Sequence, residues 1–128
     1  KTIIHTDDAP KAVGPYSQAV RTGSLLFTAG QVAIDPAIGK LIEGDVAAQA
    51  EQVMRNLQAV LTAAGTGFEH VVKTTVFLVD MADFAALNGV YGRYFPQNPP
   101  ARSTFAVRGL PLGALVEIEM VAEIPEAN

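Results

Sequence analysis

Apolar residues between positions 46 and 64 recur every three or four residues, which is the spacing of one face of an α-helix. Asp45 stands before this repeat as a candidate N-cap, and Gly65 follows it as a residue that can adopt the left-handed conformation at a helix end. The pattern therefore predicts a helix with one buried face. Its apolar positions are Val46, Ala50, Val53, Met54, Leu57, Val60, Leu61 and Ala64.

A second helix is predicted between Asp80, a candidate N-cap, and Pro96. Its apolar side consists of Phe84, Leu87, Tyr91, Tyr94 and Phe95. Asn88 lies on the same helix, where it could be a pocket residue or a hydrogen-bonding group between helices. The pattern leaves both interpretations open.

Alternating and β-branched patterns predict strands elsewhere in the chain. The expected strands are residues 16–21, 25–30, 71–79, 101–107 and 116–122. Thr22-Gly23-Ser24 would join the first two as a hairpin, and the last two are expected to form another. The dense run of β-branched residues in 71–79 predicts a strand covered on both faces.

The last predicted hairpin carries most of the candidate chemistry. Arg102 and Thr104 share one face of its first strand, while Glu117 and Glu119 project from its second strand, away from the apolar row. That row is Val116, Ile118, Met120 and Ala122. The hairpin is thus expected to hold one guanidinium and two carboxylates. Such a set is either a surface ion pair, contributing well under about 1 kcal/mol, or part of a binding site.

The order of these elements predicts a single α+β domain over residues 1–128, with the pattern βαβαββ. Strands joined by a helical crossover run parallel, so the sheet is expected to be mixed, with both helices packed on one face. The other face then needs a cover. Together with a mean hydropathy of +0.25, this predicts self-association.

Composition excludes several classes of function. The chain has 128 residues, a net charge of −4 and only nine scattered Lys and Arg residues, which argues against a nucleic-acid surface. The absence of cysteine removes disulfides and thiolate nucleophiles. No apolar run approaches the roughly 20 residues of a membrane span, and Lys1 is not followed by a signal-peptide core. We therefore expect a cytoplasmic protein.

The sequence lacks the residues needed for the usual kinds of catalytic site. His5 and His70 stand far apart without a nucleophile partner, which argues against a catalytic triad and a histidine-rich metal site. No glycine-rich phosphate loop is present. What remains is Arg102, whose planar fork can grip a carboxylate, and Glu117, which can hold and polarise a water molecule. This equipment suits hydrolysis of an already electrophilic substrate, with no metal or cofactor.

Six motifs, spread in order from Gly14 to Glu119, together resemble the RidA (YjgF) family of imine deaminases. The motifs are Gly14-Pro15-Tyr16-Ser17-Gln18-Ala19, Gly30-Gln31, Val72-Lys73-Thr74-Thr75-Val76, Asn88-x-x-Tyr91-x-x-Tyr94-Phe95, Pro100-Ala101-Arg102-Ser103-Thr104 and Val116-Glu117-Ile118-Glu119. The resemblance implies a fold similar to Bacillus-type chorismate mutase and a homotrimer with ligand clefts between subunits. It also implies hydrolysis of 2-aminoacrylate and 2-iminobutyrate, products of pyridoxal-phosphate dehydratases, to 2-keto acids and ammonia.

The same resemblance assigns roles to individual residues. Arg102 would anchor the substrate carboxylate, and Glu117 would orient or activate water at the imine carbon. Tyr16, Gly30, Asn88 and backbone groups near Thr104 would complete the substrate site. Two positions depart from the family pattern, because Ala29 stands where the family often has serine and Thr104 stands where many members have cysteine.

Two other classes of function compete with this interpretation. A non-catalytic trimer could bind small carboxylates as a regulatory signal, and it would also need Arg102. Glu117 discriminates between them, because a carboxylate beside an anionic ligand helps water activation but not simple binding. A chorismate-mutase-like enzyme would need several cations in the pocket, and only Arg102 is a candidate.

Overall fold

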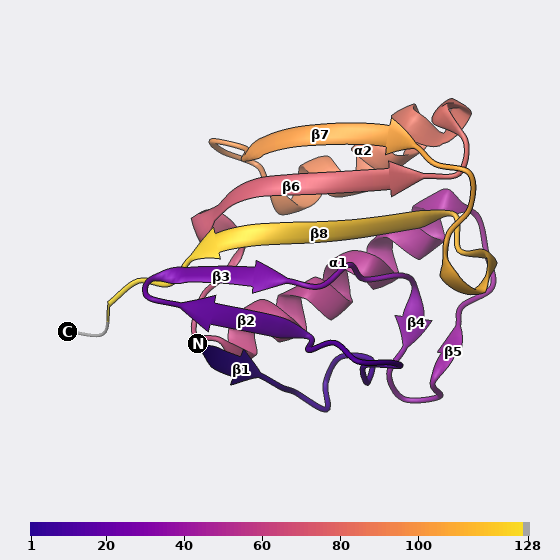
Figure 1. Ribbon diagram of the computed structural model, residues 1–128. Coiled ribbons are helices and arrows are strands. Elements are labelled where there is room, and N and C mark those ends of the chain that lie inside the picture. Colours follow the sequence, from indigo (N-terminus) through magenta and orange to yellow (C-terminus); the bar gives the residue numbers. More distant parts are fainter. Residues whose placement is uncertain (127–128) are drawn as a thin grey trace.

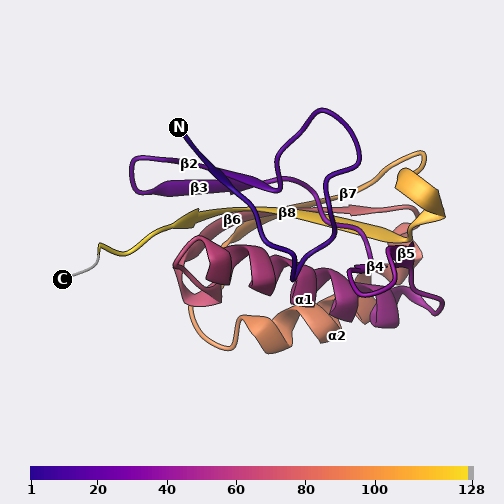
Figure 2. The ribbon, with the colours of Figure 1, turned by 90° about the horizontal axis from the view of Figure 1, so that it is seen from below.

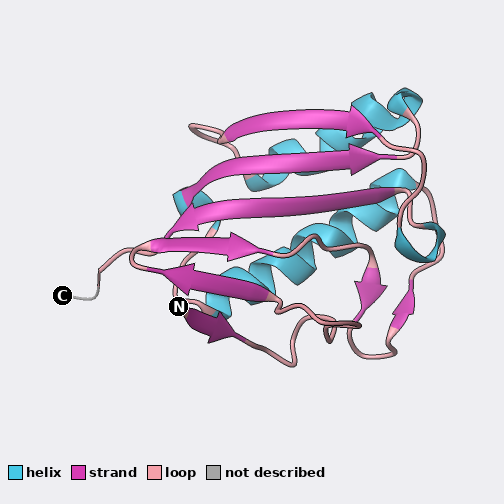
Figure 3. Ribbon diagram, in the orientation of Figure 1, coloured by secondary structure: helices cyan, strands magenta, loops and turns pink. Residues whose placement is uncertain are grey.

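The structure is a computed structural model of the chain, described here for residues 1–126. It consists of two layers, a six-stranded sheet and a pair of helices (Figures 1 and 3). The strands are β1 (Thr2–Ile4), β2 (Ala19–Thr22), β3 (Leu25–Thr28), β4 (Ile34–Asp35), β5 (Lys40–Leu41), β6 (Val71–Leu78), β7 (Ala101–Ala106) and β8 (Val116–Glu123). The helices are α1 (Val46–Ala63) and α2 (Phe84–Tyr94), and three 3-10 turns are η1 (Phe68–His70), η2 (Met81–Asp83) and η3 (Pro111–Gly113).

The main sheet is mixed, with the strand order β1-β2-β3-β8-β6-β7. Strands β6 and β7 pair in parallel through the α2 crossover, and the other neighbours are antiparallel. Figure 2 shows that α1 and α2 both lie on one side of this sheet. The expected α+β architecture, with a mixed sheet and two helices on one face, is confirmed.

The expected hairpin between residues 101–107 and 116–122 is wrong, because β6 lies between β7 and β8. Strand β8 pairs with β3 on one edge and with β6 on the other, so it is an interior strand of the sheet. Strand β7 instead occupies the free edge of β6 and becomes an edge strand (Figure 1).

The prediction that residues 71–79 are covered on both faces is also wrong for the single chain. Thr74, Val76 and Leu78 of β6 are buried against the helices, whereas Thr75 and Phe77 are only half-buried on the other face. Only one helical layer is present, so β-branched residues on the second face have no cover from the rest of residues 1–126.

Helix α1 begins where the sequence predicts, whereas α2 begins only at Phe84, because Met81–Asp83 forms a 3-10 turn and Asp83 rather than Asp80 is the residue before the helix. Asp45 caps α1 by accepting a hydrogen bond from the backbone N–H of Ala48 at 2.9 Å, and Gly65 follows the helix with a φ of +83°. Asp80 caps η2, accepting from the N–H of Ala82 at 2.9 Å, and this turn leads into α2. No helix among the described residues is long and apolar enough to cross a membrane.

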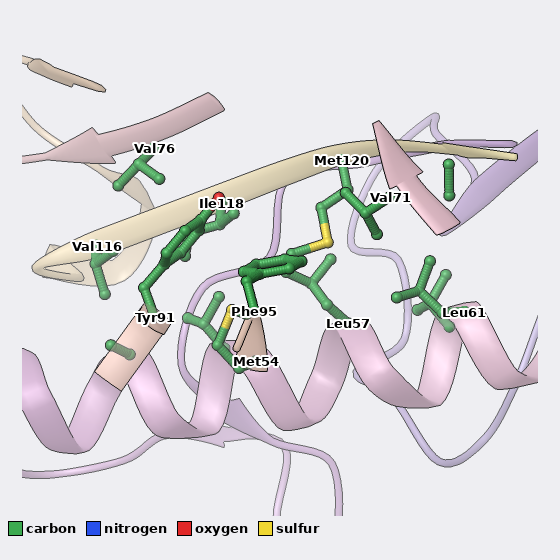
Figure 4. Close-up of a cluster of buried hydrophobic side chains, with 14 of the residues drawn as sticks. Met54, Leu57, Leu61, Val71, Val76, Tyr91, Phe95, Val116, Ile118 and Met120 are labelled. Carbon is green, nitrogen blue, oxygen red and sulfur yellow. The ribbon is translucent and has the colours of Figure 1, made fainter. Parts of the chain in front are cut away.

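The core lies between α1 and the central strands. Figure 4 shows Met54, Leu57 and Leu61 of α1 facing β8, with the rings of Tyr91 and Phe95 between the layers. The predicted apolar row of β8 is fully buried: it consists of Val116, Ile118, Met120 and Ala122. The core therefore fixes which face of β8 carries the two glutamates.

The sheet face opposite the helices, called here the outer face, exposes large apolar side chains. Phe27 is 43% exposed and Phe105 is 53% exposed, and the rings of Phe105 and Phe77 stack with their centroids 6.5 Å apart. Figure 2 also shows the last part of the β1–β2 connection, which precedes β2, rising on this side of the sheet. The outer face therefore carries large apolar side chains that are open to contact.

Candidate functional site

Arg102 projects from β7 toward the helix side of the sheet. Its register partner on β6 is Thr74, which is fully buried beneath the helices. From this position, Nη1 of Arg102 donates a hydrogen bond to Oδ1 of Asn88 on α2 at 2.8 Å. The sequence left Asn88 as either a pocket residue or a hydrogen-bonding group between helices. Its contact with Arg102, a candidate site residue, supports the first interpretation.

Two aromatic rings of α2 lie against the same guanidinium. Cζ of Arg102 is 4.7 Å from the ring centroid of Tyr91 and 5.4 Å from that of Phe84, within the range of cation–π attraction. No carboxylate of residues 1–126 forms an ion pair with Arg102. The guanidinium is therefore oriented, partly desolvated and available to an anionic ligand.

Thr104 lies two residues along β7, on the same side as Arg102. Its hydroxyl oxygen is buried and has no hydrogen-bond partner within residues 1–126. We define Arg102, Asn88, Phe84, Tyr91 and Thr104 as the arginine cluster. Sequence patterns assigned Phe84 and Tyr91 only to the apolar side of a helix, because their contact with Arg102 depends on how α2 is placed over β7.

Glu117 lies on β8 and faces the outer side of the sheet, opposite Phe77 on β6. A Cβ atom built on Gly30 would stand 2.8 Å from Cδ of Glu117, so only glycine leaves this carboxyl its place. Gln31 fixes the approach, because its N–H donates to the carbonyl of Ile118 at 2.9 Å and its carbonyl accepts from the N–H of Ile118. Gly30 and Glu117 are thus brought together.

Burial raises the pKa of the Glu117 carboxyl above its ordinary value, and the negative charge of Glu119 on the same face raises it further. We define Glu117, Glu119 and Gly30 as the glutamate cluster. A carboxylate with a raised pKa is a better proton acceptor than one in water, which suits a group that takes a proton from a bound water molecule.

Tyr16 stands in the connection before β2 and is 49% exposed. Its hydroxyl accepts a hydrogen bond from the N–H of Val13 at 3.1 Å, so its own loop holds the side chain. Gly14, with a φ of +130°, lets the chain turn beneath the ring, whose nearest atoms would be 3.6 Å from a Cβ there.

The two clusters lie on opposite faces of the sheet. Thr74, the register partner of Arg102, is buried under the helices, whereas Phe77, the register partner of Glu117, faces outward. Arg102 and Glu117 are thus not brought together within one chain, contrary to the hairpin prediction. Three hollows of about 450, 390 and 430 Å³ lie elsewhere on the surface, and neither residue lines any of them.

Comparisons with known proteins cover almost the whole chain. The family model described as endoribonuclease L-PSP matches residues 6–124. The chain is 56% identical to protein DfrA of Myxococcus xanthus over 124 residues, which is 95% of each protein. It is 46% identical to human 2-iminobutanoate/2-iminopropanoate deaminase over 122 residues, covering 95% of this chain and 89% of the human one.

A solved structure matches equally well. RidA from the Antarctic bacterium Psychrobacter sp. superposes with a TM-score of 0.94 at 45% identity, covering 97% of this chain and all of that one. The family model spans the residues of both clusters, and the structural match covers nearly the whole chain. The chain belongs to the endoribonuclease L-PSP family, the family of RidA and of proteins named 2-iminobutanoate/2-iminopropanoate deaminase.

Proposed function

We propose that the protein is a hydrolytic deaminase that converts 2-imino and enamine acids, such as 2-iminobutyrate and 2-aminoacrylate, into 2-keto acids and ammonia. The observation that carries the proposal is the guanidinium of Arg102, held by Asn88 and two rings and left without a carboxylate partner within residues 1–126. A cation fixed in this way suits the carboxylate of a small acid. The name of the human relative supports the same substrate class.

The working unit in this proposal is a homotrimer with a substrate cleft at each subunit boundary. Arg102 and Glu117 face opposite sides of one sheet, so a substrate that touches both needs them from two chains. The edge position of β7 supports this arrangement, because it leaves the arginine cluster at the border of the sheet. The exposed apolar side chains of the outer face support it as well, since burial against a neighbour removes their surface from water.

The reaction needs one water molecule and one base. The substrate carboxylate binds Arg102, which sets the distance between the imine carbon and a water held by Glu117. The imine nitrogen first takes a proton from solvent. The water oxygen then forms a bond to the carbon of this protonated imine while the C=N π electrons move to nitrogen, and Glu117 takes one proton from the water. The product of this step is a tetrahedral amino alcohol.

Collapse of the amino alcohol completes the reaction. Protonated Glu117 gives its proton to the amino nitrogen, and the C–N bond breaks to release ammonia while the hydroxyl oxygen forms the C=O bond. The hydroxyl proton passes to the Glu117 carboxylate and from there to solvent, which replaces the proton that the imine took up. The balance is one imino acid plus one water giving one keto acid plus one ammonia. An enamine enters the same route after a proton adds to its β-carbon, which converts it to the imine.

A coupled assay tests the proposal. A pyridoxal-phosphate dehydratase acting on threonine or serine supplies the imino or enamine acid in place, and the appearance of keto acid is followed with and without this protein. We expect faster release with the protein and an almost complete loss of the acceleration in Arg102→Lys, because lysine cannot form two aligned hydrogen bonds to a carboxylate. Arg55→Lys on α1, at an exposed arginine paired with Glu51, is the matched control and should keep wild-type activity.

Release at the uncatalysed rate in the presence of wild-type protein would contradict the proposal. If the protein still bound 2-oxobutanoate under these conditions, the non-catalytic carboxylate-binding function would replace it. The assembly is tested separately by light scattering, with an expected mass near three times the 13.5 kDa of one chain. A monomer mass at micromolar concentration would contradict the shared cleft.

A further inference from the structure

Tyr91 connects Arg102, the arginine proposed to bind the substrate, to the middle of the sheet. Its ring lies 4.7 Å from Cζ of Arg102, and its hydroxyl and that of Thr74 are hydrogen bonded at 2.7 Å. Thr74 is in turn the register partner of Arg102 on the neighbouring strand. The three residues are therefore linked in a ring of contacts. Backbone pairing of β6 and β7 joins Arg102 to Thr74, the hydroxyl hydrogen bond joins Thr74 to Tyr91, and the ring face of Tyr91 contacts Arg102. Figure 4 shows Tyr91 reaching from its helix toward the sheet.

Packing alone does not account for a tyrosine at this position. Tyr91 is only 6% exposed and packs against Phe95 with a centroid distance of 4.8 Å, an environment that phenylalanine would fill without a polar atom. Its hydroxyl needs a partner because an unpaired buried hydroxyl is costly, and that partner is the fully buried Thr74. The hydroxyl pair sets the height and rotation of the ring above β6 and β7.

A single hydrogen bond does not orient a guanidinium. The bond from Nη1 of Arg102 to Asn88 fixes one direction in the guanidinium plane but allows the plane to rotate about the N–H···O axis. A ring face against the guanidinium removes this rotation, because cation–π attraction holds the cation over the ring. Asn88 and Tyr91 together leave the Nε–Nη2 edge without a side-chain partner within residues 1–126, with its direction set.

We propose that Tyr91 is a positioning residue, whose ring, tied to Thr74, holds the guanidinium of Arg102 so that its Nε–Nη2 edge meets the substrate carboxylate. The inference rests on the proposed function, because that function gives Arg102 its ligand. Phe84, at 5.4 Å, contacts the same guanidinium but has no polar tie to the sheet. The decisive support is thus the ring of Tyr91, anchored at its far end.

The test uses full-length protein and three measurements on each variant. The first is the ¹H–¹⁵N resonance of Nε–H in Arg102, which an aromatic ring against the guanidinium displaces by its ring current. The second is affinity for 2-oxobutanoate by calorimetry together with kcat and KM in the coupled assay. The third is thermal stability. Arg102→Lys identifies the Arg102 resonance by its loss.

Tyr91→Leu is expected to return the Nε–H resonance toward that of a free arginine. Affinity for 2-oxobutanoate should fall about two- to thirtyfold, the range that corresponds to a cation–π contact, and kcat should fall as well because the imine carbon is less well aimed. Phe95→Leu is the matched control, since it removes a buried ring that touches Tyr91 but not Arg102. It should lose comparable stability while keeping the resonance and the affinity.

Tyr91→Phe keeps the ring and removes only its tie to Thr74, so it should fold and show a smaller change of the same sign in resonance and affinity. In the Arg102→Lys background, Tyr91→Leu should cause no further loss of affinity. An unchanged Nε–H resonance and affinity in Tyr91→Leu, or in Tyr91→Phe if the former does not fold, would reduce Tyr91 to a core residue. The same conclusion would follow if Tyr91→Leu lowered the affinity in the Arg102→Lys background by the same factor as in the wild-type protein.

The readouts separate this inference from the proposed function. If wild-type protein neither binds 2-oxobutanoate nor accelerates imine hydrolysis, the proposed function fails. The Nε–H resonance then still decides whether Tyr91 holds Arg102. A resonance that moves in Tyr91→Leu but not in Phe95→Leu supports the positioning role, and one that stays unchanged in both overturns it.

Discussion

Gly30 and Glu117 lie so close that a Cβ atom at position 30 would stand 2.8 Å from Cδ and 3.0 Å from Cγ of the glutamate. The two residues come from distant parts of the sequence and meet because Gln31 pairs with Ile118. The absence of a side chain at position 30 therefore determines where the proposed base stands.

Gly30→Ala should reduce turnover strongly and stability only slightly. The atoms that the new methyl group would meet belong to a flexible side chain, so the carboxyl moves while the backbone stays in place. Affinity for 2-oxobutanoate, which depends on Arg102, should be retained. Gly92→Ala on α2 is the control, because nothing lies within 4 Å of a Cβ there, and it should raise stability by up to about 1 kcal/mol. Wild-type turnover in Gly30→Ala would show that the position of Glu117 does not matter.

Glu117→Gln should lower turnover and raise stability. Burial and then Glu119 raise the pKa of Glu117 above 4.5, so the folded state favours the protonated form, and stability falls as pH rises from 4.5 through the raised pKa. The glutamine variant does not show this pH-dependent loss of stability. Its unfolding free energy should exceed that of wild type more at pH 7 than at pH 4, as measured by urea unfolding. Equal losses of turnover and 2-oxobutanoate binding would instead make Glu117 a support for the site.

Thr104→Val should stabilise the protein. The variant keeps the shape of the side chain and removes a buried hydroxyl that has no partner within residues 1–126, which corresponds to a gain of about 1 kcal/mol in unfolding free energy. Thr74→Val is the control on the neighbouring strand, because its hydroxyl is paired with Tyr91 and its loss should destabilise. Destabilisation by both substitutions would mean that the Thr104 hydroxyl has a partner in the assembled protein.

Tyr94 should ionise only in strongly alkaline solution. Burial first, and then the hydrogen bond from its hydroxyl to Glu51 at 2.5 Å, raise the pKa of Tyr94 to about 12. Because the folded-state pKa exceeds the ordinary 10.0, stability is lost as pH rises from 10 to 12. Tyr94→Phe should remove this part of the alkaline loss. Glu51→Gln should bring the phenolate transition, followed by absorbance, to lower pH, and an unmoved transition would contradict the assignment.

Local patterns were sufficient for the two helices and for the buried faces of α1 and β8, but they did not predict the short strands β1, β4 and β5 or the uncovered second face of β6. The helical repeat from Val46 ends within a residue or two of α1, and the alternation in β8 separates its buried row from Glu117 and Glu119. These features depend on neighbours a few residues away. The strands that pair with β8 do not depend on nearby residues, because nothing local distinguishes pairing with β7 from insertion between β3 and β6. The insertion of β6 between β7 and β8 adds to the separation of the two clusters, which also face opposite sides of the sheet.

The environment of Arg102 lay beyond the sequence for a similar reason. Asn88, Phe84 and Tyr91 are recognisable as residues of a helix, but their contact with Arg102 depends on the parallel register of β6 and β7 and on the path of the crossover. Gly30 could be identified only through the family resemblance, because its role is to leave space beside a residue far along the chain.

The opposite orientation of Arg102 and Glu117 on one sheet has a genetic consequence. If each cleft takes its arginine from one chain and its glutamate from another, two alleles with impaired activity, Arg102→Lys and Glu117→Gln, can complement each other. Unfolding and refolding the two purified variants as an equal mixture should restore about a quarter of the clefts, because half of the chains supply each intact residue independently. A site contained within one chain would stay inactive in every mixture.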